Sequence, residues 1–278
     1  MKHFFCALLL LCLSLPAQAA EKETTFDRVV RTGTINCGYA LWAPVLYKDA
    51  KTGEIKGLAH DAMIEAAKRL NLKVVWKEET AWGTIVEGLH TNRYDMICTG
   101  LAATSARAKF IDFSAPLFFA PIYLVARADD TRFDKNTDVL NDAKYKIGVL
   151  EGEISSIIAQ QKFPQAGVIA MPQTADYSLL LKEVETKKAD VTIIEIATFL
   201  EYDAHNKGKL KIIQRDRPLN VFAATLGIPI GDISLKHMID TTFNEMALDG
   251  TIAALIKKHE KYAGTMLLPA QPYLPPAK

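Results

Sequence analysis

Cysteine is scarce in this 278-residue chain, which contains four, at Cys6, Cys12, Cys37 and Cys98. Neither these residues nor the five histidines after residue 20 follow a metal-ligand spacing. A glycine-rich phosphate loop and a serine-nucleophile motif are also missing. The sequence therefore predicts neither a bound metal nor a cofactor.

An excess of charge of either sign is missing as well. The chain has 33 Lys and Arg residues against 32 Asp and Glu residues, and Lys2 lies in a segment that we expect to be removed. Proteins that bind nucleic acid need a basic surface to neutralise phosphates. We therefore expect no nucleic-acid partner.

Long hydrophobic runs are limited to one, at Phe4–Leu13, which is about half the ~20 residues needed to span a bilayer. Lys2 precedes the run, and the small-x-small sequence Ala17–Ala19 follows it. This pattern predicts a signal peptide at 1–19, cleaved near Ala19, and an exported protein, for which the resemblance described below implies the periplasm. Cys12 lacks the small residues expected before a lipidated cysteine.

Only Cys37 and Cys98 remain after cleavage, in a compartment where disulfides form. Both lie near the ends of predicted strands. Two alternatives stay open from the sequence: a Cys37–Cys98 disulfide, or two buried thiols that pack as small hydrophobic groups.

The rest of the chain alternates between strands and helices, which indicates parallel sheets covered by helices on both faces. Strands are predicted at 34–38, 72–77, 95–98, 122–127, 146–150, 168–171, 191–194 and 210–215, and helices at 58–70, 82–91, 155–161, 175–187, 235–249 and 251–261. The segment 223–228 is expected to start a return of the chain. The segment 269–278 contains four prolines and is predicted to be an extended tail.

The segment Tyr94–Phe113 is the most informative part of the sequence. An apolar strand ends in small residues, a helix is predicted to begin at Thr104, and Arg107 falls in its first turn. The helix dipole disfavours a cation there, so the arginine indicates an anion between the guanidinium and the helix start. The pattern favours a carboxylate receptor. The alternative is a surface arginine paired with Asp112.

Several landmarks occur in a specific order along the chain: Gly57 with Asp61, Tyr94-Asp95, Thr104, Arg107, Ile111-Asp112-Phe113-Ser114, Pro116, Ala189-Asp190, Asp249-Gly250-Thr251 and Ile256-Lys257-Lys258. With these landmarks the chain resembles the periplasmic solute-binding proteins of amino-acid ABC transporters, the family-3 type, over roughly Phe26 to Tyr262. The resemblance implies an α/β, two-lobe, type II periplasmic-binding-protein fold with two doubly wound sheets joined by two hinge strands.

The resemblance also implies a domain layout. Lobe 1 is expected at 20–120, lobe 2 at 121–223, and a return to lobe 1 at 224–268. Ligands of open α/β sheets bind beyond the carboxyl ends of the strands, so two facing lobes would enclose a ligand and close over it by a hinge motion. We expect a monomer.

Family positions suggest how the backbone of a ligand would be held. Arg107 matches the position that binds the α-carboxylate, and Thr99 and Gly100 match positions that contact the ligand. Ala102 stands where the family usually has a hydroxyl residue, which removes a donor. Glu195 matches an acidic residue, usually Asp, that binds the α-ammonium.

Other family positions form the walls. Trp42, Trp82 and Tyr39 match positions that line the ligand side chain, with ordinary core packing as the alternative. Gly152-Glu153 replaces a common Gly-Thr pair. Glu153 is either an acid favoured by the start of a helix or a second anion for a cationic ligand.

The sequence therefore predicts a binding protein, not an enzyme. It would capture a polar or cationic amino acid, or a related small amine, and deliver it to the membrane permease of an ABC transporter. Two alternatives remain: a periplasmic dehydratase acting on prephenate or arogenate on the same fold, or a ligand sensor for a membrane receptor. Glu153 or Glu195 would be the general acid of the enzyme.

Overall fold

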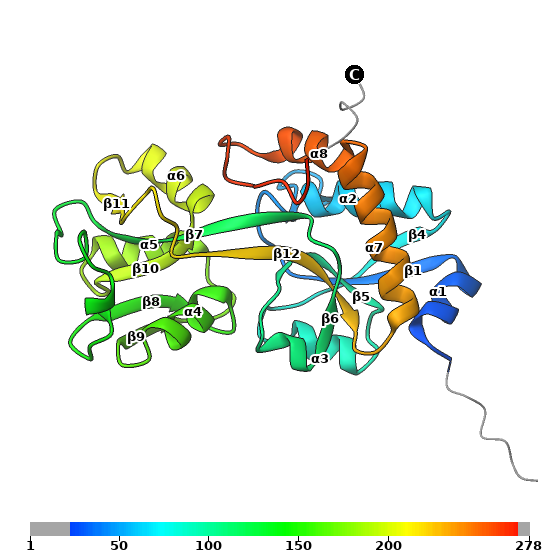
Figure 1. Cartoon of the computed structure of the whole chain (residues 1–278), viewed down its shortest axis with the longest axis horizontal. Coiled ribbons are helices and arrows are strands. Elements are labelled where there is room, and N and C mark those ends of the chain that lie inside the picture. Colours follow the sequence, from blue (N-terminus) through cyan, green and yellow to red (C-terminus); the bar gives the residue numbers. More distant parts are fainter. Residues whose placement is uncertain (1–22, 272–278) are drawn as a thin grey trace, which may run out of the picture.

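The computed structural model describes residues 23–271. The predicted signal peptide at 1–19 and the end of the predicted tail lie outside the described residues. Figure 1 shows two bodies joined by two long strands, β7 (Phe118–Arg127) and β12 (Asn220–Pro229). No helix in the described part of the chain is long and apolar enough to cross a membrane.

Hydrogen bonds connect the main strands into one ten-stranded sheet, in the order β4-β1-β5-β12-β7-β10-β8-β9, with β11 beside β7 and β6 beside β12. The remaining strand bounds are β1 Thr34–Tyr39, β2 Tyr47–Lys48, β3 Ile55–Lys56, β4 Lys73–Glu79, β5 Met96–Ala102, β6 Ile111–Phe113, β8 Lys146–Leu150, β9 Gly167–Met171, β10 Val191–Glu195 and β11 Leu210–Ile212. The structure refines the prediction of two separate sheets, because β7 and β12 pair with each other and continue the hydrogen-bond ladder between the bodies.

The two long strands belong to both bodies. Residues 118–122 of β7 pair with 220–224 of β12, after which β7 pairs with β10 and β11 while β12 pairs with β5 and β6. We assign the body built on β1, β4 and β5 as lobe 1 and the body built on β8, β9 and β10 as lobe 2. The boundaries proposed from the sequence, at 120/121 and 223/224, fall within the paired stretch.

Helices cover the sheet in both lobes (Figure 1). Their bounds are α1 Thr25–Thr32, α2 Leu58–Arg69, α3 Ile85–His90, α4 Ile154–Lys162, α5 Tyr177–Glu185, α6 Ile196–His205, α7 Ile233–Leu248 and α8 Thr251–His259, with 3-10 helices η1 Arg107–Lys109 and η2 Asp138–Leu140. In α2 the predicted four-residue spacing is seen in the core, since Leu58, Ala62 and Ala66 are all buried.

The prediction of a helix that begins at Thr104 is wrong. The segment forms only the three-residue 3-10 helix η1, in which Thr104 Oγ1 accepts a hydrogen bond from the Arg107 backbone N–H. Such a short turn has little dipole, so the dipole argument for an anion beside Arg107 fails. The alternative, a surface pair with Asp112, is also wrong, because Arg107 is buried and Asp112 accepts from the Gly231 N–H.

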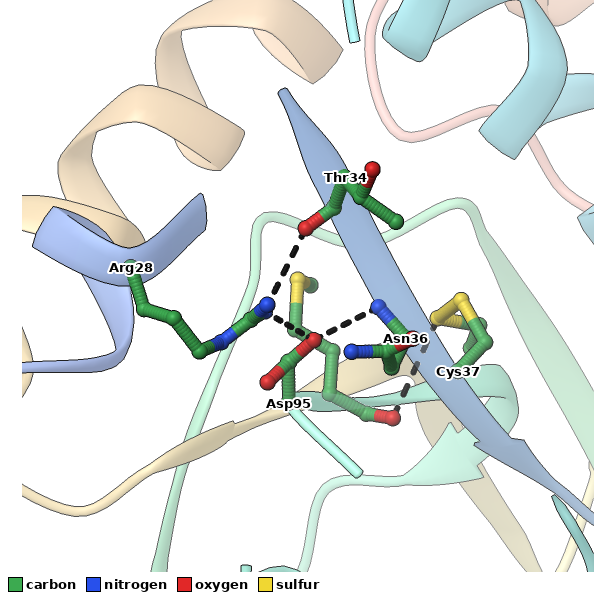
Figure 2. Close-up of a disulfide and its surroundings, with 7 residues drawn as sticks. Arg28, Thr34, Asn36, Cys37 and Asp95 are labelled. Carbon is green, nitrogen blue, oxygen red and sulfur yellow. Dashed lines mark hydrogen bonds and ion pairs between the residues drawn. A yellow bond between two sulfur atoms is a disulfide. The ribbon is translucent and has the colours of Figure 1, made fainter. Parts of the chain in front are cut away.

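A disulfide lies in the core of lobe 1. Cys37 of β1 and Cys98 of β5 are bonded, with their Cα atoms 5.4 Å apart, which is the first of the two alternatives left open above. Figure 2 shows polar contacts around it: Asp95 accepts from the Asn36 backbone N–H at 2.6 Å and pairs with Arg28. This cross-link ties neighbouring parallel strands whose chain positions are 61 residues apart.

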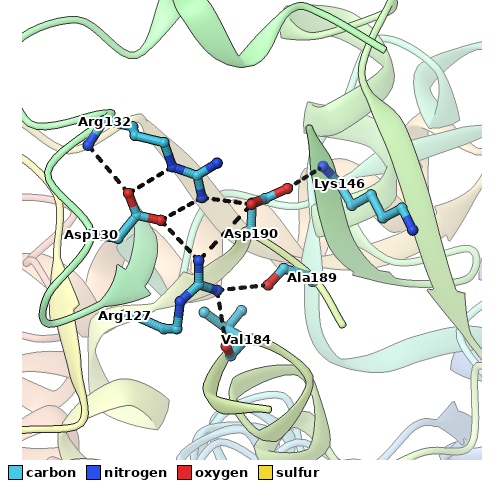
Figure 3. A network of polar contacts seen from close by, with 7 residues as sticks. All are labelled: Arg127, Asp130, Arg132, Lys146, Val184, Ala189 and Asp190. Carbon is cyan, nitrogen blue, oxygen red and sulfur yellow. Dashed lines mark hydrogen bonds and ion pairs between the residues drawn. The ribbon is translucent and has the colours of Figure 1, made fainter. Parts of the chain in front are cut away.

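A network of ion pairs lies in lobe 2 (Figure 3). Arg127 and Arg132 both donate to the buried carboxylate of Asp130, at 3.0 and 2.6 Å. Arg132 also donates to Asp190, whose other oxygen accepts from the Lys146 backbone N–H. The network therefore joins the end of β7 to the start of β8 and to the residue before β10.

Candidate ligand-binding site

A small cavity lies where the two lobes meet. Lobe 1 and lobe 2 both contribute side chains to its wall, as does hinge strand β12. Its lining residues are Trp42, Trp82, Gly100, Ala102, Arg107, Glu153, Tyr177, Glu195 and Phe222. The cavity measures about 10 Å³, which is room for roughly one water molecule. The structure is thus a tightly closed form of the cleft.

Arg107 contacts both lobes. Its Nη1 donates to the Ala102 carbonyl oxygen of lobe 1 and its Nη2 to the Gly152 carbonyl oxygen of lobe 2, both at 3.1 Å. Burial lowers the pKa of the Arg107 guanidinium below its usual value, and the nearby charge of Glu153 opposes that shift. The guanidinium is therefore a link between the lobes as well as a charged group of the cavity.

Glu195 is the last residue of β10 and stands at the start of α6. It is buried, and its Oε2 atom has no hydrogen-bond partner among the described residues. Burial and the neighbouring charge of Glu153 raise the pKa of Glu195 to about 8, against opposing hydrogen bonds from its own backbone N–H and from Thr198. An unsatisfied buried carboxylate oxygen favours a cation or a proton at this point.

Glu153 lies at the start of a helix and also borders the cavity. Its Oε2 accepts hydrogen bonds from the Ser155 N–H and the Ser155 hydroxyl, each at 2.8 Å, so it caps the first turn of α4. It also lines the cavity. Burial raises the pKa of Glu153, while the bonds from Ser155 and the charge of Arg107 oppose the rise.

Aromatic rings form most of the remaining wall. Trp42 packs against Phe222 with ring centroids 5.9 Å apart, and Trp82 and Tyr177 complete the enclosure. Gly100 allows Trp42 this position, because a Cβ atom on Gly100 would lie 2.9 Å from Trp42 Cζ3. Cations bind favourably against such rings.

Three predicted residues do not line the cavity. The hydroxyl of Thr99 donates to the Ala40 carbonyl oxygen inside lobe 1, and Tyr39 packs edge-on against Trp76. Gly152 contributes through its carbonyl bond to Arg107; a Cβ there would lie 2.8 Å from the Cα of Gly83 in the opposite lobe. Close approach of the lobes therefore requires glycine at 152.

Two lining residues were missed by sequence reasoning. Tyr177 follows Asp176, the N-cap of α5, and Phe222 lies in hinge strand β12. Asp176 is a residue type that often caps a helix, so the start of α5 could be recognised from the sequence. Nothing in the sequence indicates that the Tyr177 side chain lines a cavity between the lobes. Burial raises the pKa of Tyr177 well above its usual value.

A larger cavity of about 570 Å³ adjoins the small one, and Trp42 and Tyr177 line both. Two interlobe contacts occur at its rim, where Glu201 of α6 accepts from Lys261 at 2.5 Å and from the Tyr262 hydroxyl at 3.0 Å. In Figure 1 the segment after α8 reaches toward α6. No group of three or more metal-ligating side chains suited to a metal ion occurs within residues 23–271.

A family model matches residues 35–262: Bacterial extracellular solute-binding proteins, family 3. The chain belongs to this family. Among its relatives, the L-cystine-binding protein TcyA of Bacillus subtilis is 24% identical over 86% of this chain and 85% of its own length. The histidine-binding periplasmic protein of Salmonella typhimurium is 24% identical over 90% of this chain and 96% of its own length.

Solved structures of similar proteins have the same fold. An ancestral amino-acid-binding protein, AncCDT-1, described as a precursor of cyclohexadienyl dehydratase, superimposes with a TM-score of 0.71 at 24% identity, over 86% of this chain and 100% of its own. At this identity the likeness shows the fold alone. The family resemblance and the α/β two-lobe fold inferred from the sequence are therefore confirmed.

Proposed function

We propose that this protein is a periplasmic solute receptor, which captures a polar or cationic amino acid or a related small amine and delivers it to the permease of an ABC transporter. Family membership and the amino-acid-binding names of its relatives support this role. The signal-like segment at 1–19 supports export. The observation that carries the proposal is the buried Glu195 carboxylate with an unpartnered oxygen in an interlobe cavity.

The mechanism requires closure but no chemistry. Arg107 comes from lobe 1 while Glu153, Tyr177 and Glu195 come from lobe 2, so a ligand that contacts both sets stabilises the closed form. It shifts the equilibrium between open and closed forms only by its difference in affinity for the two. A ligand ammonium would supply the missing partner of Glu195 Oε2.

The test is a thermal-shift and calorimetric screen of refolded, ligand-free protein against the standard amino acids and small amines. A ligand at 100 times its Kd raises the free energy of unfolding by about 2.7 kcal/mol. Glu195→Gln keeps the shape but removes the charge, and should weaken binding of the hit by about 1.5–3 kcal/mol. The absence of any hit among amines and amino acids would contradict the proposal.

A second candidate is supported by one observation. Because the pKa of Glu195 is raised to about 8, this group holds a proton at neutral pH and has the protonation state of a general acid. A dehydratase acting on prephenate or arogenate would use such an acid. Incubation with prephenate tests it: ultraviolet absorbance of phenylpyruvate would appear with the wild-type protein and disappear in Glu195→Gln.

A further inference from the structure

The cavity contains two acidic side chains and one basic one. An ammonium group beside Glu195 would displace the proton that this buried carboxyl otherwise holds at neutral pH, and with Glu153 and Glu195 both ionised and Arg107 protonated the lining side chains then sum to one negative charge. A neutral zwitterion leaves this excess in place, while a ligand of net charge +1 cancels it. The charge sum alone does not separate a cationic amino acid from an amine. The two ligands differ in whether they need groups in the cavity that bind a carboxylate.

The groups that could bind a ligand carboxylate here already make bonds within the protein, although each terminal nitrogen of Arg107 keeps one N–H beyond its bond to a carbonyl oxygen. The two terminal nitrogens of Arg107 donate to the Ala102 and Gly152 carbonyl oxygens. At the start of α4, the Ser155 N–H and hydroxyl donate to Glu153. Ala102 offers only a methyl group. Glu153 thus occupies the helix start where an external anion would bind.

An incoming carboxylate would also face like charge. Glu153 is buried in the same cavity, where charges are poorly screened, so a second carboxylate beside it is strongly disfavoured. The remaining features all favour a cation: Glu195 Oε2 is unpartnered, and the rings of Trp42 and Trp82 border the same space. Aromatic walls with a carboxylate are a known way to bind organic ammonium ions.

Resting on the proposed solute-binding role, we infer that the preferred ligand is an organic ammonium ion without a carboxylate, bound by Glu195 and the aromatic rings, with Glu153 taking the place of a ligand carboxylate beside Arg107. Arg107 then acts as the internal counter-ion of Glu153 and as a link between the lobes. A longer substituent would extend past Trp42 and Tyr177 into the adjoining cavity of about 570 Å³.

The test compares ligands that differ only by the α-carboxylate. Calorimetry on the mature protein would measure lysine against cadaverine, arginine against agmatine, histidine against histamine, and alanine against ethylamine, with choline added as a quaternary ion. We expect the decarboxylated member to bind at least tenfold more tightly in any pair that binds, or choline to bind alone. Tighter binding of the amino-acid members would overturn this inference and leave the proposed function intact. No binding by either set would instead overturn the proposed function.

Glu153 provides an independent test of the same inference. Glu153→Gln keeps an acceptor for Ser155 but removes the charge, so the preference for the amine over its amino acid should fall at least tenfold. Glu153→Asp retains the charge and serves as the control, with the preference kept. An unchanged preference in Glu153→Gln, in a variant that is folded and at least as stable as the wild type, would show that Glu153 does not exclude the carboxylate.

Discussion

Two of the buried carboxylates of lobe 2, those of Asp130 and Glu195, have opposite surroundings. Asp130 accepts from Arg127 and Arg132, and the hydrogen bond from Arg132 holds its pKa below the usual range (Figure 3). Glu195 has an unpartnered oxygen, and burial raises its pKa to about 8. A paired carboxylate stabilises the fold, whereas an unpaired one lowers stability and leaves a contact for a ligand to make. The difference separates structural acids from binding acids.

Removal of the structural acid should have the largest effect. Asp130→Asn leaves two arginines without their shared partner and should lower the free energy of unfolding by about 3 kcal/mol. The control is Asp142→Asn, because Asp142 pairs with Lys144 at the surface and its loss should change stability by less than about 1 kcal/mol. Urea unfolding measures both. Equal effects of the two substitutions would contradict a structural role for the network.

Removal of the binding acid, Glu195, should stabilise the ligand-free protein. Glu195→Gln should raise the free energy of unfolding of the ligand-free protein at pH 7 by about 1–3 kcal/mol, because the folded carboxyl titrates far above its unfolded value of about 4.3. Glu153→Gln is the matched control with a smaller gain, since Ser155 already satisfies Glu153. A Glu195→Gln variant that is less stable than the wild type would contradict the contrast between Glu195 and Asp130.

Asp130 and Glu195 should also make the free energy of unfolding depend on pH in opposite directions. Because the pKa of Glu195 is raised on folding, the folded protein keeps a proton that the unfolded chain releases, so stability falls as pH rises between about 4.3 and 8. The pKa of Asp130 is lowered, so its contribution is present above about pH 3.9 and is lost as pH falls below that value. Each slope reaches at most about 1.4 kcal/mol per pH unit. Melting curves of the wild type and Glu195→Gln should converge at low pH and diverge above pH 5.

The smallest effect is expected at the exposed pair between the lobes. Lys261→Ala removes the bond to Glu201, a contact of two exposed side chains worth about 0.2–1 kcal/mol, so ligand affinity should weaken less than about fivefold and the loss should shrink in high salt. Lys188→Ala breaks the Lys188–Glu183 pair within lobe 2 and should leave affinity unchanged. Identical affinities for the two variants would show that the interlobe pair has no part in closure.

Much of the fold could be predicted because buried strands and helices have distinct periods. The predicted helix at 58–70 corresponds to α2 (Leu58–Arg69), and the predicted strand at 191–194 to β10 (Val191–Glu195). Short elements were missed, including β6, because three residues give no period. Helix α6 (Ile196–His205) was also missed, since Glu195 at its N-cap makes no side-chain capping bond and resembles the end of a strand.

The candidate site was less accessible to sequence reasoning. Gly100 and Ala102 could be grouped because small residues end one strand there and because both match family positions, and both line the cavity. Phe222 could not, because its place depends on how the hinge strands bring two lobes together. The bonds of Arg107 to two backbone carbonyl oxygens could not be predicted either, because every residue has a carbonyl group and the sequence does not distinguish those that accept a bond.

The bond from Arg107 to the Gly152 carbonyl oxygen means that the receptor contributes to its own closure. Together with the bonds at Glu201, it favours the closed shape independently of cargo. A permease that recognises the closed shape would then meet some empty receptors, and each such encounter would waste ATP. Loosening these contacts should lower the idle turnover of the transporter while raising the concentration of solute that half-saturates uptake.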